Sequence, residues 1–371
     1  ARAWHSTLAG SIFAESALVI GSAGDAGYWA ALRAALASDI GAEAAEALGQ
    51  DWLENHYRWI VWKLACQLRC FAATLGPLGF GPKAVVRQLV GRYEREMVKK
   101  KFSVLQRIVD ATDVPGVQMV LCIAAVRLGD GLVELTDGWH SAWAQCDAPL
   151  LRQLRRGRLP IGIKLRIFGA ELVPSGEKRM SDATAHRGAE FALPSLLLHA
   201  NGVRRAAWDT RLGKTKRRVF RVALSSLIEG GGPAPSVHVR IERRYGPRAL
   251  EKSTGDGESV AAWYTEAGYA AKLSREAAGS EDAPAREQGA ETGDGPPRAR
   301  TSWLLRLVVS DLSGAVGGCD RQCAASIWLN SADQAVHFQE GAAYCVVAPS
   351  VKRASFNDFG ELELEAKVHA W

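Results

Sequence analysis

The sequence predicts an α+β multidomain chain, with an α-helical domain followed by two OB-fold β-barrels, the second of which carries an insertion. Three observations support this prediction. Residues 26–112 follow a helical period, the period changes to strand-like alternation after Pro115, and the order of three strands, a short helix and two strands then occurs twice. A chain of 371 residues is long enough for three such domains with cores of their own.

The helical domain is expected within residues 1–115. Residues 50–68 carry two apolar sides, one of which contains three tryptophans. The first side consists of Leu53, Tyr57, Ile60, Leu64 and Leu68, and the second of Trp52, Trp59, Trp62 and Cys66. A helix that is apolar nearly all round must be covered all round. It is therefore either the central helix of the domain, or a helix whose tryptophans are also covered by a partner segment or a neighbouring domain.

The first barrel is expected within residues 116–234. Strands are predicted at 117–126, 132–136 and 139–145, where Asp137-Gly138 is a tight-turn signal between the last two. A short helix at 148–156 and strands at 163–173 and 193–199 complete the barrel.

The second barrel is expected within residues 235–371. Its strands are predicted at 237–244, 303–310, 324–329, 343–348 and 362–368, with a short helix at 332–339. Between the first two strands lies an insertion at about 251–300, whose second half contains almost no large apolar residue and is predicted to be a linker. Trp263, Tyr264 and Tyr269 are expected to form a helical turn or two before that linker.

The positive charge is concentrated in one part of the chain. The total is +6, but residues 116–250 contain 22 basic and 11 acidic side chains, whereas residues 301–371 contain 5 basic and 8 acidic ones. A segment this basic attracts polyanions, which include nucleic acids and acidic protein segments. An excess of arginine on an ordinary solvated surface is the other explanation.

Several classes of protein are not indicated. The longest stretches free of charged residues have 13 residues, too few to cross a bilayer, and seven cysteines spread along the chain do not form a disulfide framework. No catalytic grouping and no cofactor motif has supporting context, and the cysteine spacings lack histidines at metal-site intervals. We therefore expect no enzyme, no cofactor and no metal, and we interpret the sequence as a piece of a longer intracellular protein.

Five short motifs occur in a characteristic order. They are His56-Tyr57-Arg58-Trp59-Ile60-Val61-Trp62-Lys63-Leu64-Ala65, Val133-Glu134-Leu135-Thr136-Asp137-Gly138-Trp139, Gly169-Ala170-Glu171-Leu172-Val173, Leu224-Ser225-Ser226-Leu227 and Ser326-Ile327-Trp328. With them, residues 26–350 closely resemble the carboxy-terminal DNA-binding region of the breast cancer type 2 susceptibility protein family.

The resemblance implies a helical domain followed by OB folds, and a role as a nuclear recombination mediator. Such a protein binds single-stranded DNA and helps to load a RecA-family recombinase during homologous repair. The resemblance also implies a small acidic partner, the split-hand/split-foot-deleted protein, on the helical domain and first OB fold. The family has a long helical tower where this chain has about 50 residues, so the insertion is shortened, and a third OB fold would follow the second.

The candidate binding residues are basic and aromatic, because a groove for single strands combines cations for phosphates with rings for bases. In the second barrel the nucleic-acid candidates are Trp303, Arg306, Trp328, Tyr344, Lys352 and Arg353. In the basic run of the first barrel they are Arg204, Arg205, Lys214, Lys216, Arg217 and Arg218. The candidates for the acidic partner are Trp59, Trp62, Lys63, Arg152, Arg155, Arg156 and Arg158.

Each aromatic candidate has a competing structural explanation, because alternating strand positions place half of the side chains inside a barrel. Trp328, next to Asn330 at the end of a strand, is the one expected to be exposed. A protein-interaction scaffold whose OB folds bind only proteins is the alternative function.

Overall fold

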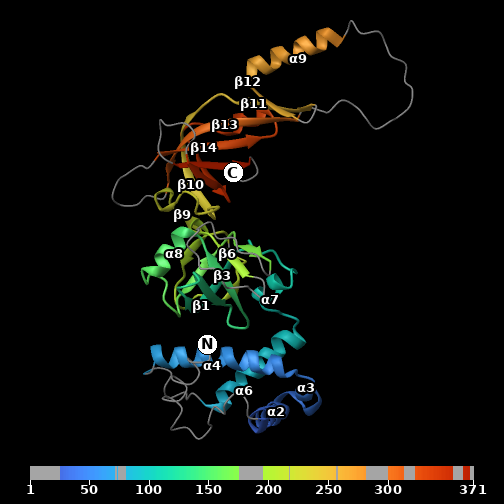
Figure 1. Ribbon diagram of the computed structural model, residues 1–371, viewed down its shortest axis with the longest axis vertical. Coiled ribbons are helices and arrows are strands. Elements are labelled where there is room, and N and C mark those ends of the chain that lie inside the picture. The colour runs from blue at the N-terminus through green and yellow to red at the C-terminus, as the bar shows by residue number, and fades with distance from the viewer. Residues whose placement is uncertain are drawn as a thin grey trace, which may run out of the picture. The chain divides into compact units, whose positions relative to one another are not determined.

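The computed structural model describes residues 26–71, 73, 81–174, 195–216, 218–255, 258–280, 300–312, 322–353 and 362–367. These residues form two compact units. The first unit comprises Ala1–Leu198 and Val203–Lys216, and the second comprises His199–Gly202 and Arg217–Trp371 (Figure 1). No helix among the described residues is long and apolar enough to cross a membrane.

The first unit begins with the helical domain. Its helices are α2 (Ala26–Ile40), α3 (Ala42–Glu46), α4 (Gln50–Cys70), α6 (Pro82–Tyr93), the π-helical turn η2 (Glu94–Val98) and α7 (Val104–Val109). Pro82 stands in the first turn of α6, where a missing N–H costs nothing. The core contains Leu36, Leu53, Ile60 and Leu89, all 0% exposed.

The first unit continues with an OB-type barrel. Its elements are β1 (Met119–Arg127), β2 (Leu132–Thr136), β3 (Ser141–Cys146), α8 (Ala148–Arg155), β4 (Lys164–Ile167), β5 (Glu171–Val173), β6 (Ser195–Leu198), β7 (Val203–Arg205) and β8 (Gly213–Lys214). The turn η3 (Ala200–Gly202), between β6 and β7 in the sequence, belongs to the second unit. The strands are ordered β5-β6-β3-β2-β1-β4-β7, and β8 pairs with β1.

The bend between β4 and β5 closes this barrel. Strand β4 is antiparallel to β1, while β5, only three residues further on, pairs with β6, which is parallel to β3. Gly169 makes the bend with φ of 68°, a conformation that residues with a side chain rarely adopt. The Gly169–Val173 motif is therefore the corner of the barrel.

The second unit repeats the same topology. Its elements are β9 (Arg221–Val222), η4 (Leu224–Ser226), β10 (Ser236–Arg244), β11 (Arg248–Gly255), β12 (Glu258–Thr265), α9 (Glu266–Ser280), β13 (Arg300–Asp311), β14 (Gln322–Leu329), η5 (Ala332–His337), β15 (Ala343–Val347), β16 (Ser350–Arg353) and β17 (Leu362–Lys367). Strand β10 pairs with β13 and β15, β13 with β14, and β14 in parallel with β17, which pairs with β16.

The predicted fold class, a helical domain followed by two OB-type folds, is confirmed. One local expectation was wrong: Trp263 and Tyr264 lie in β12 and not in a helical turn, because β11 and β12 form a hairpin whose β11 edge pairs with β13. Tyr269 lies in α9, as expected. The expected linker at 281–299 lies outside the described residues.

Residues 222–234 pack with the second barrel. Val222, Leu224, Leu227 and Ala234 all belong to its core cluster.

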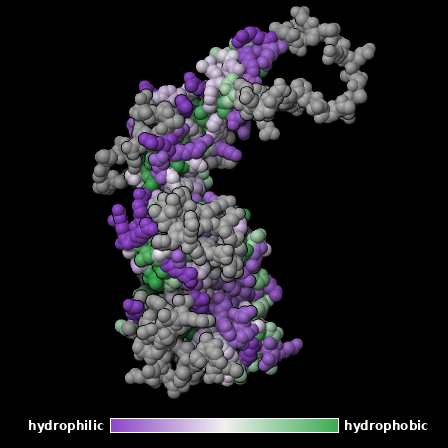
Figure 2. Space-filling view, viewed as in Figure 1, coloured by the Kyte–Doolittle hydropathy of each residue, from purple (hydrophilic) through white to green (hydrophobic). Residues whose placement is uncertain are grey.

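Among the coloured residues visible in Figure 2, hydrophilic ones predominate on both units, and hydrophobic ones form small areas. Most large apolar side chains are therefore inside the cores.

Candidate nucleic-acid interface

The second barrel has an outer face formed by β11, β12, β13, β14 and β17. On β13, Leu305 and Leu307 are 0% exposed and belong to the core cluster. Leu304 and Arg306 alternate with these two residues along the strand, so their side chains point to the outer face. Trp328 is paired with Leu304 in the ladder and lies on this outer face too.

Two tryptophans meet on the outer face. The ring centroids of Trp263 and Trp328 are 6.3 Å apart, and the rings are inclined by 31°. Strands β11 and β13 lie between their strands, so the two indoles must lean over those strands. Leu250 and Leu304, on the intervening strands, are each 7% exposed. Trp263 itself is 49% exposed, so this pair of rings, which we call the indole platform, has an accessible surface.

Glu365 fixes the orientation of Trp328. The indole Nε1 of Trp328 donates to Oε1 of Glu365 at 2.6 Å, and Lys352 forms an ion pair with the same carboxylate. Burial raises the pKa of Glu365, but the hydrogen bonds from Lys352 and Trp328 outweigh burial, so this pKa is below its ordinary value. The carboxylate is therefore ionised at neutral pH and is a strong acceptor for the indole N–H.

Basic side chains lie beside the indole platform. Arg248 is exposed and is paired with Leu304, which places its side chain on the outer face. Lys252, four residues along β11, is exposed on the same face, and Arg306 is half-buried there. OB folds hold oligonucleotides with rings and cations on the face of their second and third strands, which here are β13 with Arg306 and β14 with Trp328. The inserted hairpin β11–β12 extends this face with Arg248, Lys252 and Trp263.

Two of the predicted aromatic residues lie on the other side of the sheet. Trp303 and Tyr344 pack against the core cluster of the second barrel. The hydroxyl of Tyr344 also donates to the carbonyl of His337 at 2.7 Å. This placement favours a structural role for both over base stacking. The remaining two candidates of this barrel, Lys352 and Arg353, are exposed on β16.

The predicted basic run at 204–218 does not lie within one unit. Arg204 is half-buried and Arg205 exposed on β7, and Lys216 is exposed, all in the first unit. Arg218 is exposed in the second unit, and Arg217 lies outside the described residues.

Lys214 in this run is already occupied. Its Nζ forms an ion pair with Oδ2 of Asp113 at 2.8 Å. The number of basic residues in this run is therefore larger than the number of cations that are free to bind a phosphate.

The predicted partner-binding residues of α4 differ in accessibility. Trp59 is 2% exposed, and the guanidinium of Arg58 lies 4.8 Å from its ring centroid. Trp62 is half-buried, and exposed Lys63 donates to Oε1 of Gln88 at 3.1 Å. The barrel of the same unit lies against this side of α4, because Arg58 forms an ion pair with Glu134 at 3.0 Å. Trp59 is therefore covered within the first unit, whose barrel contacts α4 at the adjacent Arg58.

The predicted partner-binding arginines of α8 form an exposed set. Asp147 caps this helix by accepting from the backbone N–H of Leu150 at 2.9 Å, and the helix buries Leu151 and Leu154. Its other side and the residues that follow present the exposed residues Arg152, Arg155, Arg156 and Arg158.

Trp263, Arg248 and Lys252 are absent from the sequence-based set. A hairpin signal precedes Trp263, because Asp256-Gly257 is a turn dipeptide between two segments that now prove to be strands. That signal could have assigned β12 and placed Trp263 on a sheet. Its position beside Trp328 depends on long-range pairing and has no local signal.

Two family models match the chain. BRCA2, helical, matches residues 8–100, and BRCA2, oligonucleotide/oligosaccharide-binding, domain 1, matches residues 103–216. Together these ranges span more than half of the chain. The class of protein is thus a helical domain joined to oligonucleotide/oligosaccharide-binding folds, and the chain belongs to the BRCA2 family.

Two curated relatives come from Arabidopsis thaliana. Protein BREAST CANCER SUSCEPTIBILITY 2 homolog A is 36% identical over 229 residues, and homolog B is 37% identical over 229 residues. Each match covers 57% of this chain and 19% of the relative. The crystal structure of p204 HINb domain aligns with 68% of this chain and 92% of its own at 8% identity, but its TM-score of 0.19 carries no argument.

Proposed function

We propose that this chain is part of a recombination mediator that binds single-stranded DNA on the outer face of its second barrel. The indole platform carries this proposal, because an exposed indole beside arginine and lysine side chains offers both stacking and phosphate contacts. Family membership supports the wider role. In this proposal the chain is a nuclear, non-enzymatic scaffold that supports loading of a RecA-family recombinase.

We also propose that the first unit binds a small acidic protein, the counterpart of the split-hand/split-foot-deleted protein. The exposed arginines of α8 and the surplus of basic residues at 116–250 support an acidic ligand. The domain division at 115/116 and 234/235 also remains a proposal, and the packing of residues 222–234 favours moving the second boundary toward residue 217.

Replacing Trp263 by Ala tests the DNA-binding proposal. Loss of one stacking ring costs about 1–3 kcal/mol, so affinity for a single-stranded oligonucleotide should fall about 5-fold to 150-fold. Fluorescence anisotropy with a labelled oligonucleotide measures this. Trp263 is exposed, so the thermal unfolding midpoint should change little.

The matched control is Trp208→Ala, which removes another exposed tryptophan, in the first unit. The affinity of this variant for the single-stranded oligonucleotide should equal that of the parent chain. If Trp208→Ala weakens binding and Trp263→Ala does not, the first unit holds the DNA and the proposed surface is wrong.

Salt dependence separates this proposal from a scaffold that binds only proteins. If about four phosphates are neutralised, the logarithm of affinity should fall with the logarithm of salt concentration at a slope near −3. Arg248→Gln should reduce that slope by about 0.7. No binding at low salt, or a flat dependence, contradicts the proposal and favours the protein scaffold.

A further inference from the structure

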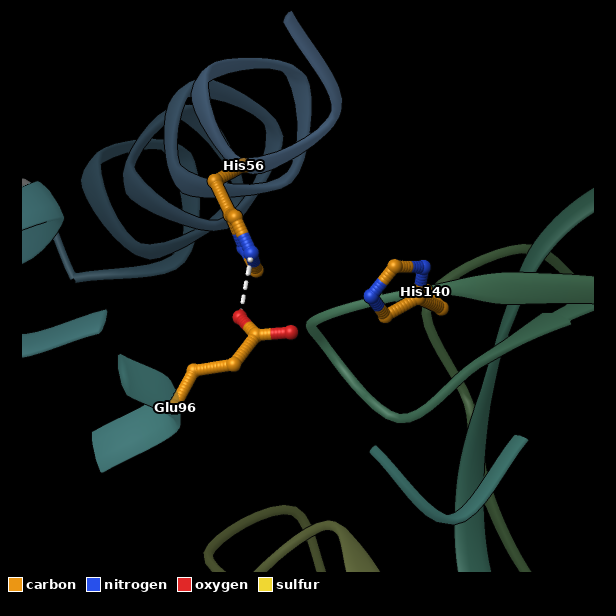
Figure 3. Close-up of side chains that lie close together, drawn as sticks. All are labelled: His56, Glu96 and His140. Carbon is orange, nitrogen blue, oxygen red and sulfur yellow. Dashed lines mark hydrogen bonds and ion pairs between the residues drawn. The ribbon is translucent and has the colours of Figure 1, made fainter. Parts of the chain in front are cut away.

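One cluster of metal-ligating side chains, two of them buried and one half-buried, occurs among the described residues, outside the indole platform. It consists of His56, Glu96 and His140, whose ligand atoms all lie within 4.8 Å of one another. His56 comes from α4, Glu96 from the π-helical turn η2, and His140 from the turn between β2 and β3 (Figure 3). The cluster therefore joins the helical domain to the barrel of the same unit.

Two of the three groups already contact each other. Nε2 of His56 lies 2.8 Å from Oε2 of Glu96, and Nε1 of Trp52 donates to the same oxygen at 3.0 Å. His56 is 0% exposed and Glu96 is 5% exposed. A carboxylate this buried, held by an indole N–H, resembles a metal ligand with its supporting hydrogen bond.

His140 completes the cluster. A ring nitrogen of His140 faces the carboxylate of Glu96 in Figure 3. The other side of the ring is occupied, because Nδ2 of Asn55 lies 3.5 Å from Nδ1 of His140. Nε2 is therefore the nitrogen available to the cluster, and it is buried without a hydrogen-bond partner among the described residues.

The electrostatics suit a cation. Burial lowers the pKa of His140, which keeps the imidazole neutral at pH 7. Burial raises the pKa of Glu96, but the hydrogen bonds from His56 and Trp52 and the charge of protonated His56 lower this pKa by more, so it is below the ordinary value. A metal ion would replace the proton on Nε2 of His56. A neutral imidazole and an ionised carboxylate are the forms that bind a metal ion.

We propose that His56, Glu96 and His140 bind a divalent ion of the zinc class, which ties the helical domain to the first barrel. Two imidazoles and a carboxylate form a zinc ligand set that leaves the fourth position to water. Zinc bonds of about 2.0–2.2 Å place the ligand atoms roughly 3.3–3.5 Å apart, so Nε2 of His56 and Oε2 of Glu96, now 2.8 Å apart, have to separate slightly. His140, half-buried in a turn, is the group that has to move in.

The position of Glu96 supports a specialised site. Residues 94–98 form a π-helical turn directly after α6. Such turns are rare and are frequent at functional sites. A buried water bridging Glu96 and His140 is the competing explanation for the same side chains.

Metal loading of the whole chain tests the proposal. The chain, prepared without a histidine tag and stripped with a chelator, is titrated with Zn²⁺ and with Co²⁺. We expect one tightly bound ion per chain, a visible Co²⁺ absorption band of a site with nitrogen and oxygen ligands, and a rise in the unfolding temperature with Zn²⁺.

Three variants locate the ion. His140→Phe should weaken Zn²⁺ binding by more than about 100-fold, and Trp52→Phe, which keeps a smaller aromatic ring but removes the supporting N–H, by about 10-fold to 100-fold. His337→Phe removes an exposed histidine of the second unit and should leave binding unchanged. Circular dichroism establishes that each variant is folded, and His140 is chosen over His56 because it is less buried.

Two results would overturn the proposal. One is the absence of a stoichiometric ion and of the Co²⁺ band in the parent chain. The other is unchanged Zn²⁺ affinity in folded His140→Phe. Either result leaves the bridging water as the explanation. DNA binding is read out separately, so failure here is distinguishable from failure of the proposed function.

Discussion

At the scale of single residues, burial divides the described cysteines into reactive and protected thiols. Cys122 and Cys146 are buried, and burial raises the pKa of each thiol to about 12. Cys345 is exposed on β15. Because the thiolate is the nucleophile, the two buried groups are both shielded and almost fully protonated at pH 8.

Alkylation should follow that division. Brief treatment of the native chain with iodoacetamide at pH 8 should modify Cys345 and leave Cys122 and Cys146 intact, and peptide mass spectrometry measures this. Urea should make all three reactive. Rapid modification of Cys122 in the native chain would mean that strand β1 opens readily.

Also at the residue scale, Glu365 shows how a charged group can position an aromatic one. Its carboxylate accepts a hydrogen bond from Trp328 and forms an ion pair with Lys352. The same carboxylate therefore holds Trp328, a candidate for base stacking, and Lys352, a candidate for phosphate binding. Lys352 is thus engaged with a carboxylate and contributes less free positive charge than its exposure suggests.

At the scale of elements, the turn between β2 and β3 explains why two sequence motifs occur together. Arg58 of the first motif donates to Glu134 of the second at 3.0 Å, and Asn55, the residue before the first motif, donates to the carbonyl of Trp139 at 2.8 Å. Arg92 donates to the carbonyl of Gly138 at 2.6 Å. The motifs are therefore the two sides of the contact between the helical domain and the first barrel.

Asp137 holds this turn together. Its carboxylate accepts from Ser103 Oγ at 2.6 Å and from the backbone N–H groups of Val104, Trp139 and His140 at 2.9–3.0 Å. Removing it leaves several donors without a partner, and the side chain is only 7% exposed. Asp137→Ala should therefore lower the free energy of unfolding by about 3 kcal/mol or more, as measured by urea denaturation.

The control for this prediction is Asp110→Ala, which removes an exposed carboxylate near the end of α7 and should change stability by less than about 0.5 kcal/mol. Equal urea midpoints for Asp137→Ala and the parent chain would show that water replaces the lost acceptor.

At the scale of the whole molecule, the uneven charge gives a prediction about the acidic partner. The exposed arginines of α8 and of the residues that follow it lie in the basic segment 116–250. Lysines 99–101 are also exposed, but they lie near the end of the helical domain. Reversing Arg155, Arg156 and Arg158 to Glu should weaken binding of an acidic peptide more than 10-fold and flatten its salt dependence.

Reversing lysines 99–101 to Glu is the matched control, because it changes the net charge equally. Isothermal titration at two salt concentrations compares the variants. Equal losses in both would mean that total charge governs binding, and no specific surface on α8 would then be supported.

The sequence by itself determined the order of elements and the fold class. Residues at helical period formed helices, alternating residues formed strands, and the repeated order of strands identified both barrels, because these patterns depend on neighbours in the chain. The five motifs likewise identified the family. Trp328 was expected to be exposed from its local position at a strand end; it lies on the outer face, but it is half-buried there.

Only the tertiary structure decided which side chains meet. Strand pairing through β11 and β13 brings Trp263 to Trp328, and packing of η2 and the β2–β3 turn against α4 gathers His56, Glu96 and His140. It also packed half-buried Trp303 against a core and paired Lys214 with Asp113. These contacts join residues far apart in sequence, so the periodicity and spacing of a single sequence carry no signal for them.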